Sequence, residues 1–214
     1  MAACSLLIAA KIAAAVSLGW AVIALAFQVW AARGGGRTEY SVRAGSPLGG
    51  LIYNFTTAML PAHKESVRRH PGKFAVGLAM HSGLLLALAG VILLLVAPAA
   101  GYRVLELIRW PLLVSLIAGF YLFVRRLFDA DLEAMSAPDD FLAILSTCAF
   151  LALVVFLPAS ETGRTILFSY TAMLFLYLPL GKLRHIVFFF IARGDFGRRL
   201  GYRGVYPPAR ATME

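Results

Sequence analysis

Five long apolar runs dominate this sequence and constrain what it can fold into. They cover residues 12–32, 74–96, 105–124, 141–157 and 165–192. An α-helix needs about 20 apolar residues to cross the hydrocarbon core of a bilayer. The chain is 60% hydrophobic, whereas soluble proteins are about 45–50% apolar. We therefore predict an all-α integral membrane bundle of five transmembrane helices that forms a single domain over residues 1–214.

Two of the five runs are irregular. The third begins with Glu106 and Arg109, whose i,i+3 spacing on a helix would let them pair. The fifth is longer than a bilayer requires and contains Pro179, which predicts a kink because proline lacks the backbone N–H donor.

The distribution of charge predicts the topology. Most of the 20 Lys and Arg residues fall in a loop over residues 33–73, in the segment after residue 124 and in a tail over residues 193–214. Cytoplasmic loops carry an excess of Lys and Arg, so the N-terminus is expected outside and the C-terminus inside. The net charge of +9 is then a topology signal. It does not indicate nucleic-acid binding, since the basic residues flank the apolar runs.

Two histidines lie inside apolar runs, His81 in the second and His185 in the fifth. Ionisable side chains are costly in a bilayer and are therefore functional candidates. With the predicted topology, both lie about 12 Å inside the cytoplasmic ends of helices that run in opposite directions, at 1.5 Å per residue. Two imidazoles at matched depth suit the axial ligation of one haem iron. The sequence thus predicts His81 and His185 as haem ligands.

Glycines precede both histidines by four residues, at Gly77 and Gly181. Helical side chains lean toward position i−4, so a porphyrin held by either histidine would pack against a glycine. Packing between helices through small residues is the alternative. Nearby cations could contact the haem propionates, or could instead extend to lipid phosphates: Lys182, Arg184, Arg68, Arg69 and Lys73.

The chain resembles the cytochrome b (gamma) subunit family of respiratory nitrate reductases. Within it, the chain is most similar to membrane subunits that partner heterodisulfide-reductase-like iron–sulfur proteins. The resemblance covers all five runs. It rests on MHSG at residues 80–83, PLGKLRH at 179–185, MLPAHKESVRRHP at 59–71 and GYRGVYP at 201–207.

The resemblance implies a haem b protein of the cytoplasmic (inner) membrane. Its partners would be a cytoplasmic iron–sulfur subunit of an oxidoreductase complex and membrane quinone, with menaquinone expected. The family often binds two b haems, and the second needs histidines near Val91 and Leu167, where this chain has none. We therefore expect one haem, on the cytoplasmic side.

His63, Lys64 and His70 lie in the loop over residues 33–73. They are candidates for a quinone pocket, although a docking surface or a solvated basic loop would use the same residues. His70 precedes Pro71 and is a weaker candidate than His81 for a haem ligand.

No catalytic triad, phosphate-binding glycine loop or paired carboxylates are visible in the sequence. The two cysteines form no CxxC or CxxCH motif, which excludes covalent c-type haem attachment and an iron–sulfur cluster on this chain. Two other functions stay open. One is a transporter or channel in which histidines relay protons, although no Asp or Glu lies deep in a run. The other is a haem-free membrane anchor.

Overall fold

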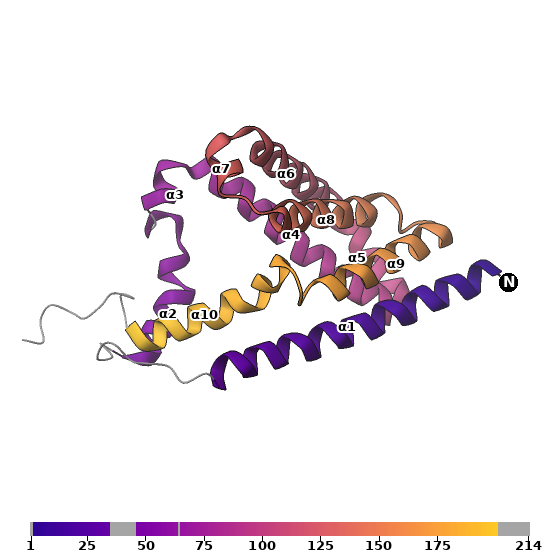
Figure 1. The fold of residues 1–214 in the computed structure, drawn as a ribbon. Coiled ribbons are helices and arrows are strands. Elements are labelled where there is room, and N and C mark those ends of the chain that lie inside the picture. Colours follow the sequence, from indigo (N-terminus) through magenta and orange to yellow (C-terminus); the bar gives the residue numbers. More distant parts are fainter. Residues whose placement is uncertain (1, 35–45, 64, 201–214) are drawn as a thin grey trace, which may run out of the picture. The chain divides into compact units, whose positions relative to one another are not determined.

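The apolar runs form long helices in the computed structural model, which describes residues 2–34, 46–63 and 65–200 (Figure 1). No strand occurs in these ranges. Among the described residues, four helices are long and apolar enough to cross a membrane. They are α1 (Ala2–Gly34), α4 (Pro71–Val96), α6 (Arg109–Phe128) and α8 (Pro138–Phe156). The prediction of an all-α protein with several transmembrane helices is confirmed.

The helix starts follow proline positions. Pro47, Pro71, Pro98 and Pro138 each begin a helix. Proline suits this position because its fixed φ matches a helix and its missing N–H would have no partner there. The chain groups into two compact units. The first unit comprises Met1–Ala24 and Gly72–Leu183, and the second comprises Leu25–Pro71 and Arg184–Glu214.

The core of the first unit joins residues from α1, α4, α5, α6, α8 and α9 (Glu161–Tyr177). Ala14, Phe150 and Phe168 are among its fully buried members. The helices approach one another through small residues. A Cβ added at Gly83 would lie 2.2 Å from Ser115 Cβ, and Ser115 Oγ donates a hydrogen bond of 2.9 Å to the carbonyl of Met80. Small residues and interhelical hydrogen bonds are typical of helix packing in membranes.

The predicted third span is wrong at its start. A separate helix, α5 (Pro98–Leu107), contains Glu106, and α6 begins only at Arg109. α5 turns back onto the end of α4, because a Cβ at Gly101 would lie 2.3 Å from the backbone N and Cα of Leu94. The last residues of α5 and those of α6 are mostly apolar, so they form one continuous apolar run in the sequence.

The predicted fifth span is also not one continuous helix. α9 ends at Tyr177, a 3₁₀ turn η3 covers Lys182–Arg184, and α10 covers His185–Leu200. α9 thus ends two residues before Pro179, close to the kink predicted from the backbone N–H that proline lacks. α9 and α10 count as a fifth span only as a bent pair.

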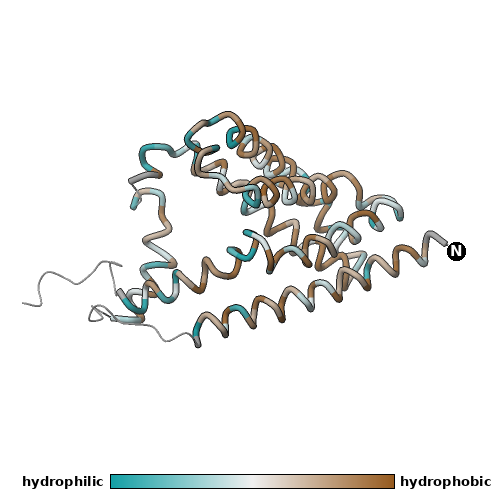
Figure 2. Tube along the Cα trace, viewed as in Figure 1, coloured by the Kyte–Doolittle hydropathy of each residue, from teal (hydrophilic) through white to brown (hydrophobic). Residues whose placement is uncertain are grey.

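The connection between α6 and α8 contains hydrophilic residues (Figure 2), and some of its charged side chains form ion pairs. It contains the short helix α7 (Ala130–Ala134). Arg125 forms an ion pair of 3.2 Å with Asp129, and the N–H of Leu132 donates to the same carboxylate. Burial alone would raise the pKa of Asp129, but these two hydrogen bonds lower it below the usual value. The charge of Asp129 is therefore offset within the chain.

The second unit is held by α2 (Pro47–Phe55) and α10, which lie side by side (Figure 1). Arg193 donates two hydrogen bonds, of 2.9 and 2.7 Å, to the carbonyl of Asn54. A Cβ at Gly197 would lie 2.6 Å from the carbonyl oxygen of Gly50. The unit also contains η1 (Thr57–Met59), η2 (Pro61–His63) and α3 (Glu65–Arg69).

Candidate functional site

His81 lies in the first unit, ten residues after α4 begins at Pro71, and its side chain is exposed. Its Nδ1 is 2.7 Å from the carbonyl oxygen of Gly77, one turn earlier. Because a carbonyl can only accept, Nδ1 carries the hydrogen in this contact. The neutral ring then has its lone pair on Nε2. A backbone carbonyl commonly fixes the tautomer of a metal-binding histidine in this way.

Gly77 lies four residues before His81, where a porphyrin held by His81 was expected to pack, and the space beside it is open. Apart from its chain neighbours and the adjacent backbone of α4, no heavy atom of the described residues would lie within 4 Å of a Cβ added at Gly77. Gly83 and Gly90 differ, because a Cβ there would meet Ser115 or Leu105. The four glycines of α4 thus divide into two that pack against neighbouring helices and two open ones, Gly72 and Gly77, of which Gly77 lies one turn before His81.

His185 lies in the second unit as the first residue of α10, with an exposed side chain. The argument from Gly181 is wrong, because the residues between Tyr177 and His185 do not form an α-helix. A Cβ at Gly181 would lie 2.2 Å from the ring of Tyr177. Gly181 therefore makes room for a tyrosine of its own chain rather than for a porphyrin. The pairing of His81 and His185 on one iron stays a prediction.

Lys182 belongs to a polar clasp that holds the break after α9 to the start of α8. Its backbone N–H donates to Asp139 at 2.8 Å, and its Nζ forms an ion pair with Asp140. The hydroxyl of Tyr177 donates to the other oxygen of Asp139. Arg126 also contacts Asp140, at 3.5 Å. A propionate at Lys182 would have to compete with Asp140 for the ammonium group.

We expect Asp139→Ala to destabilise the first unit by about 1–3 kcal/mol, because it leaves the hydroxyl of Tyr177 and the N–H of Lys182 without their acceptor. The measurement is thermal unfolding of the purified protein in detergent. Asp131→Ala is the matched control, since Asp131 is an exposed acid of the same loop. Equal unfolding curves for the two variants would show that the clasp contributes nothing.

The remaining predicted residues lie mostly in the second unit. His63, Arg68, Arg69, His70 and Arg184 all have exposed side chains. Arg68 and Arg69 end α3, His63 ends η2, and Arg184 ends η3. Lys64 is outside the described residues. The roles of these residues at a propionate or a quinone stay predictions.

The positions at which a second haem would need histidines are part of the packed core. Val91 is 2% exposed and Leu167 is fully buried. Both belong to the hydrophobic cluster of the first unit. Val91 and Leu167 therefore serve as core residues of the first unit.

Sequence reasoning missed the clasp and the contact between Asn54 and Arg193. In the sequence, Asp139 and Asp140 are two adjacent acids and Tyr177 is an aromatic residue of an apolar run, and nothing indicates that they meet. One signal was present: Lys182 follows a predicted kink, and a cation there needs an anionic partner. The pairing of residues 139 positions apart, as between Asn54 and Arg193, has no local signal.

The chain matches no family model, no curated protein and no solved structure. The resemblance to the gamma-subunit cytochromes b therefore stays a hypothesis drawn from the motifs themselves.

Proposed function

We propose that this chain is the membrane-anchor cytochrome b subunit of a respiratory oxidoreductase complex, with His81 and His185 as the axial ligands of one b haem. The observation that carries the proposal is the local geometry of His81. Its Nδ1 is fixed by the Gly77 carbonyl at 2.7 Å, and the helix surface above Gly77 is bare. These two features together suit an axial imidazole beside a flat macrocycle.

A bound haem supplies one-electron chemistry that no side chain of this protein can supply. His81 and His185 hold the iron through neutral imidazole nitrogens. The Gly77 carbonyl orients the first ring and raises its basicity. Arg184 lies next to His185 in the chain and contributes a cation for a propionate, whereas Lys182 is already paired with Asp140.

The subunit passes electrons between membrane menaquinone and a cytoplasmic iron–sulfur partner, in the cytoplasmic membrane, with its N-terminus outside. The excess of Lys and Arg in the segment over residues 33–73 and in the C-terminal tail supports this orientation. His63, Lys64 and His70 are the quinone candidates. The partner and the quinone follow from the family resemblance, and the orientation follows from charge alone.

The test is the optical spectrum of the full-length protein purified from haem-replete cells. After reduction with dithionite we expect a sharp b-type alpha band and about one haem per chain by pyridine haemochrome assay. A colourless, folded preparation would overturn the proposal and favour a haem-free anchor.

Gly77→Leu should remove the haem without unfolding the protein. A Cβ at this position meets no atom of a neighbouring element within 4 Å in the described residues, so a loss of haem from a folded variant would report occupancy of the space beside His81. Gly72→Leu is the control, because Gly72 is equally open and lies about 140° away around α4 at 3.6 residues per turn. The measurement is haem content together with gel filtration. Full haem content in Gly77→Leu would contradict the placement of the macrocycle.

A further inference from the structure

A cavity of about 360 Å³ lies in the first unit, at the end where α4 finishes and α9 begins. Leu7 and Lys11 of α1, Leu94 of α4, Tyr102 of α5, and Arg164 and Phe168 of α9 contribute to its lining. Its volume is in the range of small-molecule sites. Leu94 is thirteen residues from His81, about 20 Å along the helix at 1.5 Å per residue. The cavity is therefore separate from the proposed haem site.

Two cations line this cavity. Arg164 is partly buried and donates hydrogen bonds to the carbonyls of Pro158 and Ala159, at 3.2 and 3.4 Å. Lys11 is also partly buried, and its Nζ lies 5.8 Å from the centroid of the Phe168 ring. Within residues 2–34, 46–63 and 65–200, no carboxylate lies within 4.0 Å of either cation.

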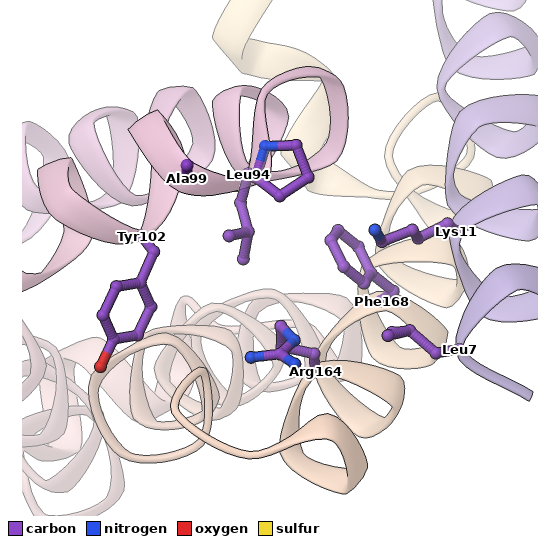
Figure 3. Close-up of a pocket in the computed structure, with 8 residues that line it drawn as sticks. Leu7, Lys11, Leu94, Ala99, Tyr102, Arg164 and Phe168 are labelled. Carbon is purple, nitrogen blue, oxygen red and sulfur yellow. The ribbon is translucent and has the colours of Figure 1, made fainter. Parts of the chain in front are cut away.

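Partly buried cations without an acidic neighbour favour an anionic ligand, because desolvation of a charge is costly unless an opposite charge offsets it. Figure 3 shows Arg164 and Leu94 pointing into the hollow between the rings of Tyr102 and Phe168, with Lys11 beside Phe168. The rest of the lining is largely apolar: Leu7, Leu94 and Phe168 supply aliphatic and aromatic walls. The ligand that fits has an anionic head and an apolar body.

The depth of the cavity identifies the source of that anion. α4 ends at Val96 and α9 begins at Glu161, so the cavity lies at the level where transmembrane helices meet the headgroup region. Lys and Arg near the ends of such helices extend toward lipid phosphates. We propose that Lys11 and Arg164 bind the phosphate of one anionic phospholipid, whose acyl chain packs on Leu7, Leu94 and Phe168.

The experiment titrates phosphatidylglycerol into the detergent-solubilised full-length protein and counts bound lipids by native mass spectrometry. We expect one lipid to bind before all others, and phosphatidylcholine to bind about tenfold more weakly because its ammonium faces two cations. Lys11→Gln and Arg164→Gln should each weaken phosphatidylglycerol binding about tenfold, the effect of one charge-assisted hydrogen bond.

Arg103→Gln is the matched control, because Arg103 is an exposed cation of α5 outside the cavity lining. It should leave binding unchanged, and Lys11→Arg, which keeps the charge, should retain binding within about threefold. Melting temperatures near that of the parent protein would show that the Gln variants are folded. Equal affinity for the two lipids, or equal loss in Arg103→Gln, would overturn the proposal. Displacement of the lipid by equimolar inorganic phosphate would show a free-anion site and would also overturn it.

Discussion

His81→Ala and His185→Ala should each yield a colourless protein, with haem content falling from about one per chain to less than a tenth of that. Six-coordinate b haems depend on both axial bonds, and the proposed site offers no substitute ligand. Both side chains are exposed in the chain as described, so truncating them leaves no cavity in a core. We therefore expect changes in folding stability within about 0.5 kcal/mol, and the loss of haem is separable from unfolding.

The controls are His63→Ala and His70→Ala, which should retain the full alpha band. These are exposed histidines of the second unit, and the proposal gives them no bond to iron. A further variant, His81→Gly, should regain the band when imidazole is added to the buffer, because the free ligand can replace the missing ring. If both alanine variants keep haem with an unshifted band, the ligands lie elsewhere and the proposed site is wrong.

The sequence predicted correctly those features that depend on one helix alone. Hydropathy is a sum over neighbouring residues, so it located α4 and α8 to within three residues of their observed starts. The break after α9 followed from one residue, Pro179, whose effect on a helix is local. The open surface beside His81 was likewise expected from a glycine one turn before it.

Sequence reasoning failed where the role of a residue depends on what another helix places beside it. Gly181 was assigned to a porphyrin, yet its missing side chain accommodates the ring of Tyr177. Lys182 was a candidate for a propionate or a lipid phosphate, and the sequence did not show that Asp140 pairs with it from α8. Hydropathy also merged α5 with α6, because an apolar helix that turns back has the same composition as one that continues. Lys11 and Arg164 line one cavity although 153 positions separate them.

The packing of α5 on α4 should make Gly101 one of the hardest glycines of the first unit to replace. A Cβ at Gly101 would lie 2.3 Å from both the backbone N and the Cα of Leu94. Backbone atoms inside a helix cannot rotate away as a flexible side chain can, so α5 must move as a whole. We expect Gly101→Ala to lower the free energy of unfolding by about 2–3 kcal/mol, the upper part of the range for an overpacked site.

Gly19→Ala is the matched control, because the same substitution is not expected to lower the free energy of unfolding there. Gly19 lies inside α1, and its added Cβ would meet nothing within 4 Å. Alanine is a better helix former than glycine by about 1 kcal/mol in a helix interior, so this variant should be neutral or stabilised. The measurement is thermal unfolding of both variants in the same detergent. The two substitutions differ in that only Gly101 lies against the backbone of another helix. Similar melting temperatures for Gly101→Ala and Gly19→Ala would therefore contradict the close contact between α5 and α4.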